Sequence, residues 1–129
     1  MKRTLYFLVS LLLISALFHS CKKEEFDETL LIGTWGTPSS PGTTGKAGIL
    51  HYKFLSNHTG GSWDTADGLQ ESDAQLFEWR LEKSDLTIIH IMEMGGGRVP
   101  EYFTVTQLTA TTLKVKDDFN VNITFTKVK

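Results

Sequence analysis

Apolar and polar residues alternate with a period of two along much of the chain. The alternation is clearest over residues 77–81, 113–116 and 121–126, and this period over short runs indicates strands that bury one face. β-branched and aromatic residues are frequent in strands such as these. No stretch after residue 21 keeps a helical apolar period, so we predict an all-β fold in which residues 29–32 form a single helical turn.

Eight strands are predicted, and they are evenly spaced with turn residues between them. They span residues 32–37, 49–56, 60–65, 75–82, 85–93, 98–107, 112–117 and 121–128. Regular spacing of short strands is typical of a sandwich or barrel, and a closed meander of eight strands has no exposed sheet edge. We therefore predict an eight-stranded antiparallel up-and-down barrel.

The connections between these strands differ in length at the two ends of the predicted barrel. The second, fourth and sixth connections are tight turns, whereas the first (38–48) and third (64–74) are long and the fifth contains the glycines of 95–97. In a meander, alternate connections share one end. The sequence therefore predicts a cup whose mouth is lined by long, pliable loops.

The N-terminus has the order of a secretory signal. Lys2 and Arg3 precede a mainly apolar run over residues 5–18, and Ser20 stands before the single cysteine, Cys21. A basic start, an apolar run of roughly 7–15 residues and a small residue at the cleavage point define such signals. The run is shorter than the roughly 20 residues of a membrane-spanning helix, which favours a cleaved signal over an uncleaved anchor.

Cleavage before Cys21 makes its thiol the new N-terminal group, free to carry lipid. We therefore predict a lipoprotein signal peptide at 1–20, a lipidated Cys21 in a charged linker at 21–28, and a barrel domain at 29–129. A lone cysteine excludes an internal disulfide, and no Cys/His spacing indicates a zinc site. Each buried methylene of an acyl chain contributes about 0.8 kcal/mol to membrane binding.

Residues 22–25, Lys-Lys-Glu-Glu, resemble the export signal of surface lipoproteins in the Bacteroidetes. The residues before Cys21 depart from the usual lipobox at His19. The resemblance implies a lipid anchor in the outer membrane, with the domain either exposed at the cell surface or facing the periplasm. Residues 21–129 carry 11 basic and 15 acidic side chains, a net −4 that argues against nucleic acid as a partner because such binding needs a basic face.

The segment Gly33-Thr34-Trp35 is similar to the Gly-x-Trp of lipocalins, and the strand pattern from residue 29 onward resembles small lipocalin-like lipoproteins of the Bacteroidetes. The resemblance implies that Trp35 plugs the closed base of the barrel and that Gly33 lets the chain approach it. No cysteine pair ties the barrel, and the short strands predict a shallower cup. An eight-stranded barrel is filled by side chains or holds one small ligand; the sequence leaves both open.

Patterns for catalysis or metal binding are absent from the sequence. No serine lies in a nucleophile elbow, no carboxylate pair is placed for acid–base chemistry, and the glycines of 95–97 lack the lysine of a phosphate loop. His51 and His58 flank a predicted turn without carboxylate partners and are interpreted as surface imidazoles. We predict no enzymatic activity, no cofactor and no metal site.

Aromatic residues near the predicted mouth are the best candidates for a binding site, because small-molecule pockets are mostly apolar with a few polar groups. The candidate ligand-binding residues are Trp63, Phe77, Tyr102 and His90. His90 faces the cup if its strand buries Ile88 and faces solvent if the strand buries Ile89, since a one-residue slip exchanges the two faces.

These patterns predict a membrane-anchored, lipocalin-like lipoprotein that binds a small apolar or amphipathic ligand without chemistry. The alternative is a solid barrel that acts as an interaction module or inhibitor. In that case the long loops at residues 38–48 and 64–74 would bind an envelope protein or a glycan.

Overall fold

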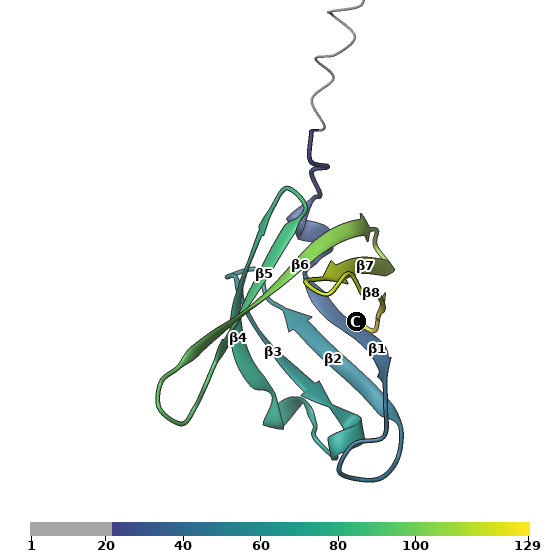
Figure 1. Ribbon diagram of the computed structural model, residues 1–129, viewed down its shortest axis with the longest axis vertical. Coiled ribbons are helices and arrows are strands. Elements are labelled where there is room, and N and C mark those ends of the chain that lie inside the picture. The colour runs from purple at the N-terminus through teal and green to yellow at the C-terminus, as the bar shows by residue number, and fades with distance from the viewer. Residues whose placement is uncertain (1–21) are drawn as a thin grey trace, which may run out of the picture.

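A computed structural model describes residues 22–129, so Cys21 and the predicted signal peptide at 1–20 lie outside the described residues. Eight antiparallel strands form a closed barrel in which each strand pairs with its neighbours in sequence and β1 pairs with β8 (Figure 1). The strands are β1 (Gly33–Ser39), β2 (Gly48–Phe54), β3 (Thr59–Asp64), β4 (Gln75–Glu82), β5 (Asp85–Ile91), β6 (Arg98–Leu108), β7 (Thr112–Asp117) and β8 (Asn122–Lys127). The prediction of an all-β, eight-stranded up-and-down barrel is confirmed.

Among residues 22–129, the helical content is limited to short 3-10 turns. η2 (Glu28–Leu30) matches the turn expected at 29–32, and it is capped by Asp27, whose Oδ1 accepts hydrogen bonds from Thr29 Oγ1 and Thr29 N. These bonds hold the pKa of the Asp27 carboxyl below its usual range. η3 (Thr65–Asp67) and η4 (Glu71–Asp73) lie in the third connection, where the polar sequence has no periodicity to predict them.

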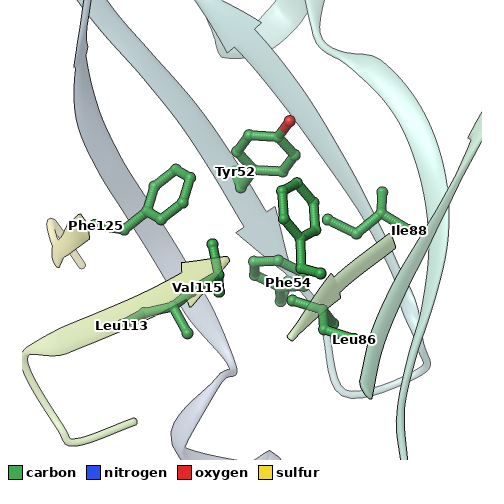
Figure 2. Close-up of a pocket in the computed structure, with 8 residues that line it drawn as sticks. Tyr52, Phe54, Leu86, Ile88, Leu113, Val115 and Phe125 are labelled. Atoms are coloured by element: carbon green, nitrogen blue, oxygen red, sulfur yellow. The ribbon is translucent and has the colours of Figure 1, made fainter. Parts of the chain in front are cut away.

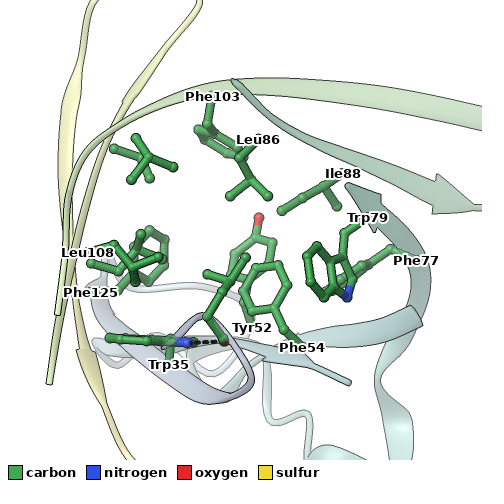
Figure 3. Packing of buried hydrophobic residues seen from close by; sticks show 14 residues of the cluster. Trp35, Tyr52, Phe54, Phe77, Trp79, Leu86, Ile88, Phe103, Leu108 and Phe125 are labelled. Atoms are coloured by element: carbon green, nitrogen blue, oxygen red, sulfur yellow. Dashed lines mark hydrogen bonds between the residues drawn. The ribbon is translucent and has the colours of Figure 1, made fainter. Parts of the chain in front are cut away.

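Trp35 closes the end of the barrel at which the chain enters (Figure 3). Its indole is fully buried, and Nε1 donates a hydrogen bond of 2.8 Å to the carbonyl of Leu31. Lys127 covers the ring, with Nζ 5.0 Å from the ring centroid. Gly33 has φ +130°, and a Cβ there would lie 2.5 Å from the Lys129 carbonyl oxygen, so this position requires glycine.

Inward-facing residues of all the strands except β3 pack into a single core. Phe54 lies at its centre, with its ring 5.6 Å from Trp79 and 5.4 Å from Phe77 in edge-to-face geometry. Such aromatic pairs stabilise a core beyond the area they bury. The Trp79 Nε1 proton has acceptors in the carbonyls of Leu55 and Thr59 at 3.2 and 3.1 Å. The indole is therefore satisfied although it is buried.

The two long connections expected to be pliable are instead tied to each other at the mouth. Thr43 N donates to Asp67 Oδ1 at 2.8 Å, and Thr44 Oγ1 donates to the Ala66 carbonyl at 2.7 Å. Gly48 passes so close to Ala66 that a Cβ would overlap its backbone. The first connection therefore lies against η3, at the opposite end of the barrel from η2 (Figure 1).

Candidate functional site

The interior of the barrel is filled by its own side chains. An interior cavity of about 10 Å³ lies between residues of β2, β5, β6, β7 and β8, whose side chains point toward one another (Figure 2). A cavity needs at least about 10–15 Å³ to hold one water molecule. The sequence left open whether side chains fill the barrel or the barrel holds a small ligand inside. In the structure, side chains fill it.

A larger hollow lies on the outer face of the barrel, over β3 and β4. This groove has a volume of about 330 Å³, and Gly60 and Gly61 belong to its lining. Gly61 is paired with Lys53 on β2 and with Leu76 on β4. Since paired residues share a face of the sheet, Gly61 leaves a gap in a row of outward side chains. Its neighbours become the walls of the groove.

The walls of the groove are largely apolar. They include Leu55, Leu76 and Ile91, with Trp63 and Ala74 nearer the mouth. Leu76 is 58 % exposed, whereas Trp63 is only 8 % exposed. The Trp63 ring stacks on His51 with centroids 4.8 Å apart and an interplanar angle of 7°, which fixes its position.

Phe77 reaches the groove from the inner side of the wall. It is paired with Gly60 and is itself buried. A Cβ at Gly60 would lie 2.6 Å from Phe77 Cε2 and Cζ, so the ring packs directly against the glycine backbone. Glycine within a strand commonly marks such a close approach.

An ion pair forms one lip of the groove. η4 carries Glu71 to Lys53 on β2, and the hydrogen bond from Lys53 holds the pKa of the Glu71 carboxyl below its usual value of 4.5. The lip is stiffened by Gln70, whose N–H donates to Asp73 Oδ2 at 3.0 Å. The pair is exposed, so solvent screens it and it contributes little to stability.

The four candidate residues do not form one site. Trp63 and Phe77 both line the outer groove, although all four residues were expected to contact a ligand near the mouth of the cup. Tyr102 pairs with Thr87 on the outward side of β6 and is half-exposed. His90 pairs with Phe77 and faces inward. Of the two registers considered, β5 therefore has the one that buries Ile88.

His90 belongs instead to a polar network at the open end of the barrel. Its Nε2 lies 2.8 Å from Glu101 Oε2, which also accepts a hydrogen bond of 3.3 Å from the Tyr52 hydroxyl. Burial, followed by the charge and hydrogen bond of Glu101, raises the pKa of the Tyr52 hydroxyl far above its usual value. Sequence reasoning missed Glu101, although it shares the inward period of Phe103 and Val105.

Within residues 22–129, no group of three or more His, Cys, Asp and Glu side chains is arranged to hold a metal ion. In the same part of the chain, no helix is long and apolar enough to cross a membrane. No protein-family model, curated protein or solved structure matches the chain. The fold and the groove define the class of molecule: a closed, filled, eight-stranded antiparallel barrel with an apolar groove in its outer wall.

Proposed function

We propose that this protein binds a small apolar or amphipathic ligand without catalysing a reaction, and that the ligand occupies the outer groove. One observation carries the proposal: the groove offers about 330 Å³, whereas the interior offers about 10 Å³. Small-molecule sites commonly range over about 300–1,000 Å³ and are apolar with a few polar groups. The groove falls at the small end of this range.

The chemistry of the groove suggests how the ligand lies. Its apolar part would cover the backbone of Gly60 and Gly61 and contact Leu76 and Ile91. Each 100 Å² of apolar surface removed from water would contribute about 2.5 kcal/mol. A polar head would meet the Lys53–Glu71 ion pair at the lip.

The N-terminal pattern supports a location for this activity. In our proposal Cys21 carries lipid and the domain is held at the outer membrane, at the cell surface or on the periplasmic side. The chain enters beside η2, at the closed end of the barrel (Figure 1). A tether there would leave the groove on the side of the barrel and the mouth pointing away from the bilayer.

The test is binding of the fluorescent probe 1-anilinonaphthalene-8-sulfonate to the purified protein. Leu76→Asp places a charge on the groove wall and is expected to weaken probe binding by about tenfold or more. Phe119→Ser is the matched control, because it removes an 88 % exposed apolar side chain on the β7–β8 turn, away from the groove. Equal probe binding by both variants would contradict the proposal.

Native mass spectrometry of gently purified protein complements the probe. A compound that copurifies with the wild type but not with Leu76→Asp would identify the ligand class. A compound that stays bound to Leu76→Asp would place the ligand elsewhere. Retained folding of the variant is checked by its circular dichroism spectrum.

A further inference from the structure

A second hollow lies at the mouth, between η4 and the hairpin formed by β5 and β6. It has a volume of about 320 Å³ and is lined by Asp73, Gln75, Met92, Glu93 and Met94. We propose that this hollow receives a lysine or arginine side chain of a partner protein. The site is separate from the ligand groove and does not rest on the function proposed for it.

The lining of the hollow suits both the aliphatic stem and the charged head of a long basic side chain. Lysine and arginine combine an aliphatic stem with a charged head, and the hollow combines the thioethers of Met92 and Met94 with the carboxylates of Asp73 and Glu93. Methionine adapts its shape to an apolar guest. Met92 is positioned by Gln75, whose Nε2 donates to Met92 Sδ at 3.2 Å.

The two carboxylates differ in their existing contacts. Asp73 Oδ2 already accepts the Gln70 N–H at 3.0 Å, which fixes the carboxylate at the edge of the hollow. Glu93 has no ion-pair partner among residues 22–129. An incoming cation would therefore pair with Glu93 without displacing a lysine or arginine of this chain.

The charge of the whole mouth favours a basic partner. The four mouth connections span residues 40–47, 65–74, 92–97 and 118–121, and together they carry five acidic side chains and one lysine. Complementary charge speeds association and excludes wrong partners. It also argues against docking of the mouth on an anionic membrane, since like charges repel.

Exposed apolar side chains lie on both connections that form the hollow. Met94 is 94 % exposed at the tip of the hairpin, which projects from the barrel (Figure 1). Leu69 is also exposed, on the connection that precedes η4. The hydrogen bonds between the first and third connections hold this side of the mouth in place, which lowers the entropy lost on binding.

Addition of a partner strand at the free strand edge nearby is disfavoured at Pro100, which favours binding through side chains. β7 ends at Asp117, opposite Phe103, so residues 98–102 of β6 have no neighbour on that side. Val105 directs its N–H to Ser84 on the β5 side, and backbone directions alternate along a strand. The nitrogen of Pro100 therefore faces the open edge, where it has no proton to donate, as is usual for proline in edge strands.

The test is binding of a synthetic peptide of alternating leucine and lysine to the purified protein, measured by fluorescence anisotropy. We expect Glu93→Lys to raise the Kd by about tenfold or more. Glu82→Lys makes the same change in net charge at the other end of the barrel and is expected to leave the Kd within about threefold of the wild type. A Met94→Ser variant should also weaken binding, because it removes the contact with the aliphatic stem.

Three results would overturn the proposal. The first is an equal effect of Glu93→Lys and Glu82→Lys, which would show attraction by net charge only. The second is failure of the wild type to bind the leucine–lysine peptide better than a leucine–glutamate peptide. The third is tighter binding to phosphatidylglycerol vesicles than to the peptide, which would assign the mouth to a membrane. Leu76→Asp should leave peptide binding unchanged. Failure of the proposal for the mouth can therefore be distinguished from failure of the proposal for the groove.

Discussion

His90 Nε2 and Glu101 Oε2 lie 2.8 Å apart across β5 and β6, inside the open end of the barrel. The contact joins two inward positions, since His90 pairs with Val99 and Glu101 with Ile88. Glu101 also accepts a hydrogen bond from the Tyr52 hydroxyl. The Glu101 carboxylate therefore links Tyr52 in the core to His90 at the mouth.

The charge of Glu101 should be measurable through the ionisation of Tyr52. Burial is the larger cause of the raised pKa of Tyr52 and the Glu101 charge the next, so Glu101→Gln should lower this pKa but leave it above its usual value of 10.0. The tyrosinate absorbance reports the titration, and a Tyr102→Phe background removes the other tyrosine of the described residues. An unchanged titration curve would show that the charge of Glu101 does not reach Tyr52.

The same shift predicts how stability changes at alkaline pH. The folded protein holds the Tyr52 proton more tightly than the unfolded chain does. The resulting stability is present below pH 10.0 and is lost as pH rises through the raised pKa of the folded state. Tyr52→Phe should therefore reduce the alkaline loss of stability, measured as the free energy of unfolding in urea at several pH values.

Trp35 should be among the largest single contributors to stability. Trp35→Ala removes a fully buried ring and the hydrogen bond to Leu31, and large-to-small core substitutions of this kind cost roughly 3–5 kcal/mol. Denaturant unfolding gives the free energy directly. A cost below about 1 kcal/mol would show that the base of the barrel is held by other residues.

Gly60 and Gly97 should differ sharply in their tolerance of alanine. A Cβ at Gly60 would overlap the Lys53 carbonyl and the Phe77 ring, whereas a Cβ at Gly97 would meet only Met92 at 3.7 Å. Overpacking typically costs about 1–3 kcal/mol, and a backbone overlap leaves less room for relief. Gly60→Ala should therefore lower the unfolding midpoint well below that of Gly97→Ala. Similar midpoints would contradict the packing described over Gly60.

The contribution of the Lys53–Glu71 ion pair to stability should depend on pH in the acid range. The pKa of Glu71 is depressed in the folded state, so the contribution of the pair is present above pH 4.5 and is lost as pH falls through the lower, folded-state value. The difference in unfolding midpoint between wild type and Glu71→Gln should be small, because the pair is exposed. It should also disappear in acid, and a constant difference would exclude this ion pair as its source.

Two prolines should protect the barrel against strand pairing between molecules. Pro100 faces the open edge of β6, and Pro38 lies on the part of β1 that extends beyond its pairing with β8. Replacing both with threonine restores two N–H donors at exposed edges, which are templates for aggregation. Light scattering should then show concentration-dependent association that the wild type lacks. A variant that stays monomeric would assign these prolines no such role.

The strand pattern could be read from the sequence because period two and turn residues are local properties. Each of the eight predicted strands lies within two residues of its observed bounds. The position of Trp35 at the base was also predicted, although from a resemblance to lipocalins. The turns η3 and η4 were not predicted, because a single turn has no apolar periodicity, although local caps mark both: Asp64 caps the start of η3 and a capping box between Gln70 and Asp73 begins η4.

The sequence by itself determined eight short strands in a meander, since alternation and turn spacing are local properties, whereas closure into a barrel depends on the pairing of β1 with β8. Only the tertiary structure decided which face each candidate residue occupies. Trp63 faces outward and His90 inward because of strand register, and register depends on pairing between strands. The filled interior and the groove over Gly60 and Gly61 likewise depend on the sizes of side chains from several strands. The local sequence pattern does not show which of these side chains pack together.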